Sequence, residues 1–352
     1  MQTSPLNILV FGAGAIGTYI GGSLAIAGHR LTFVEQPAVA ETLRQRGLKL
    51  DLTVDKRRGE RSTFEVREAV FADSLESALA ASRYDVAIFA LKSFDTLSAL
   101  ETLKPFREVL PPILCLQNGV DNEPAIAAAL GAEKVIYGTV TSAVGRGGPG
   151  EITLEKLRGM GLAGSSELSY RVAAALDEAL LNCRVFQNAA EMKWSKLLTN
   201  LLANPTSAIL NMTAAEIYAH PDLYRLEIEQ LRECLAVMKA QGLNTVDLPG
   251  TPVRLLALAT KLPTWLSKPF LSKAAGAGRG GKMPSFHIDL YAGRTSSEVT
   301  YLHGAVVRTG ANFGVPTPVN KLLTETLLAL AEKRLPLDEF AGKPDKFLAK
   351  LK

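Results

Sequence analysis

The chain has 352 residues, which suits about two domains, and 47% of them are hydrophobic, enough for packed cores. Lysine and arginine exceed aspartate and glutamate by only 39 − 35 = 4, so the charge gives no reason to expect nucleic acid or an anionic membrane as a partner. No run approaches the roughly 18 apolar residues of a membrane-spanning helix, and we expect no membrane span. Three widely spaced cysteines and an N-terminus without signal-peptide features predict a cytoplasmic protein.

The first half of the sequence alternates apolar strand patterns with helical patterns. Strands are predicted within residues 6–12, 29–36, 84–93 and 112–121, and two more, joined by a glycine-rich turn, within 134–155. Each strand is apolar throughout, which is typical of a parallel sheet covered on both faces. We therefore predict an α/β fold whose N-terminal domain, residues 1–187, is of the Rossmann type.

Strand patterns nearly vanish after residue 188, and we predict an all-helical C-terminal domain over 188–352. Helices are expected at 191–210, 213–242 and 296–314. Within it, residues 247–282 combine prolines, short apolar stretches and scattered lysine and arginine. A role at a membrane surface is one interpretation, and a helical insertion packed on the second domain is the favoured one.

A glycine-rich sequence follows the first strand and opens a helix. It reads Gly12, Ala13, Gly14, Ala15, Ile16 and Gly17. In this context the first glycine permits a tight turn, the second lets a pyrophosphate approach the backbone, and the third allows helix and strand to pack closely. The helix N-terminus favours the anion. The pattern predicts a dinucleotide-binding loop.

The second strand ends in Glu35 and Gln36, and Glu35 lies 18 residues after Gly17. An acid there can accept hydrogen bonds from the adenosine ribose and would repel a 2′-phosphate, which favours NAD(H) over NADP(H). Two alternatives stay open. Glu35 could face solvent just past the strand, and Arg44 or Arg46 could fold back to hold a phosphate.

Polar residues follow two further strands. Lys92 and Ser93 follow one, and Asn118 and Gly119 follow the next. Open α/β sheets bind ligands at the carboxyl ends of their strands, so a shared cleft is predicted there. Either pair alone would also fit an ordinary polar strand end.

A polar stripe runs along the first predicted helix of the second half. Lys193, Lys196, Asn200 and Asn204 span about 80° of the helical wheel, and Pro205 is expected to end or bend the helix. Asparagine is a poor helix former, which argues for a ligand surface, and a solvated face stays open as the alternative.

The remaining candidates are Ser285, after a proline, and Glu298, after a Gly-Arg turn. Glu298 could equally cap the next helix or form a salt bridge with it. The four histidines form no metal-binding pair, and we expect no metal site.

Together these motifs resemble one family over nearly the whole chain. GAGAIG, ALKS, LQNG, WSKLLTNLLANP, PSFHIDL with GRTSSEV, and GVPTPVN occur in the order and spacing of 2-dehydropantoate 2-reductases, also called ketopantoate reductases. The resemblance implies NADPH-dependent reduction of 2-dehydropantoate to (R)-pantoate, a step of pantothenate and coenzyme A biosynthesis. Members occur as monomers and dimers, so a homodimer stays open.

The resemblance also implies roles for individual residues. The catalytic residues would be Lys196 and Glu298, and the substrate-binding residues Asn118, Asn200, Asn204 and Ser285. The cofactor-binding residues would be the glycine loop, Glu35, Gln36, Lys92 and Asn118. Glu35 and Gln36 stand where the family often has an arginine for the 2′-phosphate, so NAD(H) competes with NADP(H). A related 2-oxo acid reductase, an opine-type dehydrogenase and a dinucleotide sensor without turnover are the alternatives.

Overall fold

The computed structural model describes residues 4–60, 62–269, 271 and 283–351. The chain divides into two compact units. The first contains residues up to Gln117, Asp121–Lys193 and Leu248–Thr251. The second contains Asn118–Val120, Trp194–Asp247 and the residues from Pro252 onward. The chain therefore passes from the first unit to the second inside one helix, α7 (Ala189–Leu201), a few residues after the predicted boundary at 187/188.

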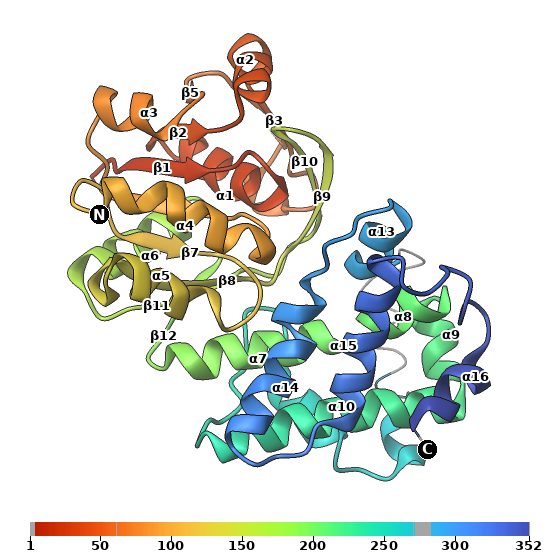
Figure 1. Cartoon of the computed structure of the whole chain (residues 1–352). Coiled ribbons are helices and arrows are strands. Elements are labelled where there is room, and N and C mark those ends of the chain that lie inside the picture. Colours follow the sequence, from red (N-terminus) through yellow and green to blue (C-terminus); the bar gives the residue numbers. More distant parts are fainter. Residues whose placement is uncertain (1–3, 61, 270, 272–282, 352) are drawn as a thin grey trace. The chain divides into compact units, whose positions relative to one another are not determined.

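An eight-stranded sheet forms the centre of the first unit (Figure 1). Its order is β12-β11-β8-β7-β6-β1-β2-β5, and all paired neighbours are parallel except β8 and β11. The strands are β1 (Asn7–Phe11), β2 (Arg30–Val34), β5 (Val70–Ala72), β6 (Val86–Phe89), β7 (Ile113–Cys115), β8 (Val135–Val140), β11 (Met160–Ala163) and β12 (Cys183–Phe186). The predicted Rossmann-type parallel sheet is confirmed.

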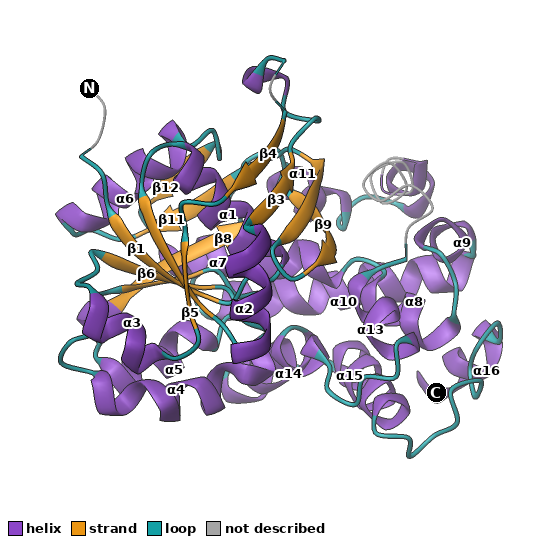
Figure 2. Cartoon of the chain, turned by 90° about the horizontal axis from the view of Figure 1, so that it is seen from above, coloured by secondary structure: helices purple, strands orange, loops and turns teal. Residues whose placement is uncertain are grey.

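Helices cover both faces of this sheet (Figure 2). One face carries α1 (Ala15–Ile26) and α6 (Glu167–Glu178), and the other carries α3 (Leu75–Ala81), α4 (Thr96–Leu103) and α5 (Asn122–Leu130). Side chains alternate between the two faces along β1: Ile8 and Val10 enter one core, and Leu9 and Phe11 enter the other. Apolar residues at every position of the strand are thus explained by burial on both sides.

A second, four-stranded sheet was not predicted. Its order is β4-β3-β10-β9, with the strands β4 (Thr63–Val66), β3 (Leu48–Asp51), β10 (Glu151–Lys156) and β9 (Ala143–Gly148). The prediction of two strands within 134–155 is wrong, because this stretch forms β8 and then the β9–β10 hairpin. The strand β9 reads AVGRGG and is only partly buried, so its glycines suggested a turn. Gly22 of α1 lets the helix approach this sheet, since a Cβ there would lie 2.7 Å from Leu50 Cδ2.

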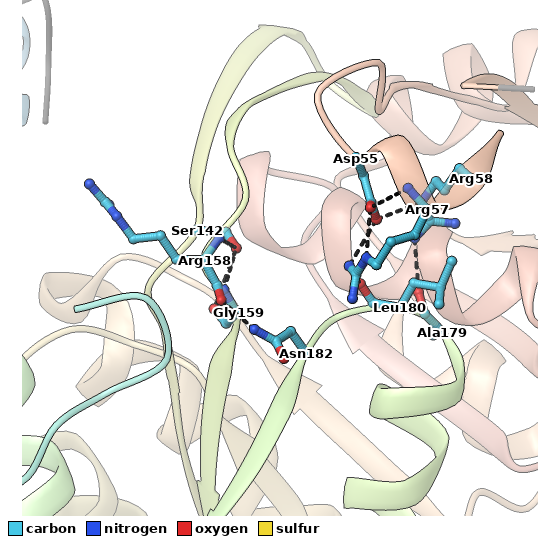
Figure 3. A network of polar contacts seen from close by, with 9 residues as sticks. All are labelled: Asp55, Arg57, Arg58, Ser142, Arg158, Gly159, Ala179, Leu180 and Asn182. Carbon is cyan, nitrogen blue, oxygen red and sulfur yellow. Dashed lines mark hydrogen bonds and ion pairs between the residues drawn. The ribbon is translucent and has the colours of Figure 1, made fainter. Parts of the chain in front are cut away.

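Arginine side chains hold the strained turn between α6 and β12 (Figure 3). Leu180 and Asn182 have φ values of 61° and 52°, in the left-handed region that few non-glycine residues adopt. Arg57 donates to the Leu180 carbonyl at 2.6 Å, and its charge is paired with Asp55 at 2.8 Å. Asn182 donates to the carbonyl of Arg158 at 2.6 Å. These bonds stabilise a turn that backbone preferences alone would disfavour.

The second unit is built of helices, as predicted. They are α8 (Asn204–Leu210), α9 (Ala214–Ala219), α10 (Pro221–Ala240), α11 (Val253–Ala259), α13 (Ser285–Tyr291), the 3₁₀-helix η5 (Glu298–Tyr301), α14 (His303–Asn312), α15 (Pro318–Ala331) and α16 (Pro344–Leu348). The long helix α10 packs against α14 and α15 (Figure 1). Three stretches expected as single helices are each divided, 191–210 into α7 and α8, 213–242 into α9 and α10, and 296–314 into η5 and α14.

The segment 247–282 is only partly described. Leu248–Thr251 belongs to the first unit, and α11 follows in the second. Trp265 is 74% exposed, so the described part of the insertion is not fully packed. Residues 270 and 272–282 lie outside the described residues. Over the part of the chain that is described, no helix has both the length and the apolar character needed to cross a membrane.

Candidate active site

The glycine loop joins β1 to α1 with the geometry that an anion-binding turn requires. Gly12 has φ +90°, which glycine adopts without strain. A Cβ at Gly17 would lie 2.0 Å from the Gly12 carbonyl oxygen, so only glycine fits there. A Cβ at Gly14 would meet nothing within 4 Å, which leaves that side of the loop open. The first turn of α1 carries no acidic residue, and the open cradle fits a pyrophosphate.

Glu35 lies against this loop. Its half-buried carboxylate accepts a hydrogen bond from the backbone N–H of Ala13 and one of 3.3 Å from that of Gln36. Gln36 is exposed and precedes α2 (Pro37–Arg46). Of the two interpretations of Glu35, the structure favours the one in which it faces the nucleotide loop. A carboxylate in this place is suited to accept from ribose hydroxyls.

The two arginines that could hold a 2′-phosphate are engaged elsewhere. Arg44 pairs with Asp73 at 3.1 Å and with Glu41 at 3.2 Å. Arg46 donates to the carbonyl of Pro149 and pairs with Glu151 at 3.4 Å. Each guanidinium is therefore already neutralised by at least one carboxylate.

The ends of β6 and β7 meet in the first unit, as predicted. The two strands are parallel neighbours. Beyond them, the Gln117 side chain donates to the Lys92 carbonyl at 3.1 Å and to Thr96 Oγ1 at 2.9 Å. Thr96 in turn donates to Asn122 at 2.8 Å. These bonds hold the backbone of Lys92 near the carboxyl ends of β6 and β7. Lys92 directly precedes the 3₁₀-helix Ser93–Asp95.

Asn118 and Asn200 are brought together in the second unit. Asn200 Nδ2 on α7 donates to Asn118 Oδ1 at 3.1 Å, although 82 positions separate the two residues. The next residue, Gly119, has φ +91°, and a Cβ there would lie 2.7 Å from the carbonyl oxygen of Tyr301. Tyr301 ends η5, whose first residue is Glu298, buried at 6% exposure. The residues 118–119 thus lie between α7 and η5.

Asn204 connects α7 with the helix that begins at Ser285. Its Nδ2 donates to the Asn200 carbonyl at 3.2 Å, and its Oδ1 accepts from the backbone N–H of Phe286 at 3.2 Å. Ser285 is exposed at the start of α13. The side chain of Asn204 is 3% exposed and serves first to hold α13 against the end of α7. Direct contact of Asn204 with a substrate stays a prediction.

A buried carboxylate creates the break between α7 and α8, and the sequence did not reveal it. Ala203 has φ +50°, and Glu227 accepts from its backbone N–H at 2.7 Å and from Thr206 Oγ1 at 2.6 Å. Glu227 is fully buried, and Gln230 donates to it at 2.6 Å. Pro205 lies in the first turn of α8, where its missing N–H costs nothing. The predicted break is confirmed, but it falls before Pro205.

Burial separates the two lysines of the polar stripe. Lys196 is half-buried, as is Asn200 one turn later, whereas Lys193 is buried at 3% exposure. Among the stripe residues on α7, Lys196 and Asn200 are therefore the ones that a ligand can reach.

A Rossmann-type unit with an open glycine loop, followed by a helical unit that presents lysine, amide and carboxyl side chains, is the architecture of a two-domain oxidoreductase. The family model described as "Ketopantoate reductase PanE/ApbA" matches residues 8–164, and the one for its C-terminal part matches 188–331. The chain belongs to the ketopantoate reductase family.

Individual relatives agree with this result. The 2-dehydropantoate 2-reductase of Streptococcus pyogenes is 26% identical over 271 residues, 76% of this chain and 82% of the relative. That of Halobacterium salinarum is 25% identical over 337 residues, 93% and 99% of the two chains. The crystal structure of 2-dehydropantoate 2-reductase from Geobacter metallireducens has a TM-score of 0.74 at 26% identity, covering 93% of this chain and all of that one.

The fold is shared more widely. A ternary structure of D-mandelate dehydrogenase with NADH and anilino(oxo)acetate has a TM-score of 0.73 at 20% identity, covering 95% of this chain and 99% of that one.

Proposed function

We propose that the protein reduces 2-dehydropantoate to (R)-pantoate, with Lys196 as proton donor. The observation that carries this proposal is the hydrogen bond from Asn200 to Asn118, because it places two amide side chains beside the helix turn that bears Lys196. Membership of the ketopantoate reductase family supports the choice of substrate.

The residues suit the chemistry of a ketone reduction. A reduced nicotinamide, when bound, supplies the hydride. The carbonyl oxygen then gains negative charge, and the Lys196 ammonium stabilises this charge and donates a proton, a contribution of about 10²- to 10⁴-fold. Asn118 and Asn200 can hydrogen-bond the substrate's hydroxyl and carboxylate groups without changing the charge of the site. By resemblance we assign Glu298 to the catalytic residues and Ser285 and Asn204 to substrate binding.

We further propose that NADH is the preferred cofactor, although the family resemblance implies NADPH. The contact of Glu35 with Ala13 supports NADH, because a 2′-phosphate would have to approach a carboxylate. The pairing of Arg44 and Arg46 with carboxylates also supports it, since neither arginine is available without losing a partner. The glycine loop, Gln36 and Lys92 complete the proposed cofactor site.

The proposal is tested by crossing NADH and NADPH with a panel of 2-oxo acids and following the absorbance of the nicotinamide. We expect turnover of 2-dehydropantoate, with NADH giving the higher kcat/KM. If only another 2-oxo acid is reduced, a related 2-oxo acid reductase replaces the proposed enzyme. If the cofactor binds but nothing is reduced, the protein is a dinucleotide sensor, and the roles of Lys196 and Glu298 are refuted.

A further inference from the structure

Lys193 carries a buried charge that the proposed reaction does not use. Its Nζ lies 2.6 Å from Glu123 Oε1, and it donates to the carbonyls of Gln117 at 2.7 Å and Gly138 at 3.2 Å. The side chains of Lys193 and Glu123 are 4% and 0% exposed. Two backbone carbonyls thus accept from the ammonium, and Glu123 supplies the opposite charge beside it. It is therefore not available as a proton donor to a substrate.

Burying the Lys193–Glu123 ion pair carries a desolvation penalty, because both charges lose their contact with water. Burial raises the pKa of the Glu123 carboxyl, and the Lys193 ammonium opposes this rise. A pair of similar volume without charge would often be at least as stable. What an apolar pair could not do is bind the Gln117 carbonyl, which lies beyond the end of β7 and outside its strand ladder. The Lys193 side chain thus binds the backbone of Gln117, which has no partner in the strand ladder of β7 and β8.

The backbone held in this way leads directly to the candidate site. Gln117 is the last residue of the first unit before Asn118, and Lys193 is the last before the chain continues along α7. One turn after Lys193 comes Lys196, and one turn further Asn200 holds Asn118. The segment 117–118 is therefore attached to α7 at two places, by Lys193 on one side of Lys196 and by Asn200 on the other.

We propose that Lys193 and Glu123 are positioning residues, which fix the backbone entering Asn118 against the start of α7. The inference rests on the proposed function, in which Asn118 and Lys196 act on the substrate. Glu123 lies beside the buried amino group as its counter-charge, and that amino group binds the Gln117 carbonyl. Neither residue touches the substrate.

The test separates positioning from stability with three variants. Lys193→Met leaves Glu123 buried without its cation, so both stability and activity are expected to fall. Lys193→Met combined with Glu123→Gln removes both charges, which is expected to restore much of the melting temperature. Because the bond to Gln117 is still missing, kcat is expected to stay about 10- to 100-fold below wild type, with the KM for the cofactor unchanged.

A second buried pair in the same unit provides the matched control. Arg58 and Asp55 lie 3.4 Å apart with side chains 5% and 1% exposed, and Arg58 donates to the carbonyl of Ala179. Arg58→Met combined with Asp55→Asn removes an ion pair of similar burial, together with the contact between Asp55 and the more exposed Arg57. We expect it to change the melting temperature and to leave kcat at the wild-type value.

Hydrogen exchange of the amides of Asn118 and Gly119 gives a measurement without substrate. It is expected to be at least about 10-fold faster in the Lys193→Met, Glu123→Gln double variant than in wild type and in the control. Wild-type kcat together with unchanged exchange in that double variant would overturn the proposal. If the wild-type protein reduces no 2-oxo acid, the proposed function fails, and the exchange rates alone decide whether the pair fixes this backbone.

Discussion

Replacing Glu35 by glutamine should weaken the discrimination against NADPH. The carboxylate accepts a hydrogen bond from Ala13 in the glycine loop, and glutamine keeps an oxygen that can accept the same bond. A phosphate charge of about −2 at about 5 Å from a carboxylate is repelled by about 2 kcal/mol at the dielectric constant of water and by about 7 kcal/mol at an effective value of about 20. Solvent and counterions screen this half-buried site, so we take the lower figure, which is about 30-fold in affinity.

The assay compares kcat/KM for NADH and NADPH in wild type and Glu35→Gln. The ratio is expected to move towards NADPH by about 30-fold at low ionic strength and by less in high salt. Glu65→Gln serves as the control, because it removes an equally negative side chain of β4, 54% exposed, whose partner is Arg67 directly after that strand. A ratio that stays within twofold of wild type would show that Glu35 does not face the ribose.

Three further predictions concern other parts of the molecule. Lys196→Ala should lower kcat by about 10²-fold or more with cofactor binding intact, and normal turnover would refute its role as proton donor. Gly17→Ala should abolish cofactor binding measured by fluorescence titration, because its Cβ would lie 2.0 Å from the Gly12 carbonyl oxygen.

Burial lowers the pKa of His303 from 6.5 to about 3 in the folded protein. As the pH falls below about 6.5, the imidazole is protonated in the unfolded state and stays neutral in the folded state, so the folded state loses stability. Between pH 7 and 5, the free energy of urea unfolding should fall by about 2 kcal/mol more in wild type than in His303→Asn.

The sequence revealed the large sheet because each of its strands is buried on both faces. Leu9 and Phe11 are as apolar as Ile8 and Val10, since each pair enters its own core. The second sheet lacks this signal. The strand β9 contains three glycines, and β4 alternates two exposed residues with one partly buried and one buried residue. Strands of this composition are held by their neighbours, and their own residues do not specify them.

The helix break shows a similar limit. Pro205 indicated an interruption, but the left-handed residue is Ala203, which has no intrinsic tendency to adopt that conformation. Glu227, from a different helix, accepts its N–H and makes the break there. A contact between residues 24 positions apart leaves no periodic pattern in the sequence, so only the proline was visible.

The two lysines of α7 show why the polar stripe alone could not identify a catalytic residue. Helical periodicity gives the direction in which a side chain leaves the helix axis, and Lys193 and Lys196 share that direction within about 60°. It does not give the surroundings at each turn. The chain passes from one compact unit to the other directly after Lys193, so that lysine is enclosed by Glu123, Gln117 and Gly138, while Lys196 begins a stretch with partly exposed polar side chains. A lysine on the same face of the helix is therefore enclosed in an ion pair at one turn and accessible to a ligand at the next.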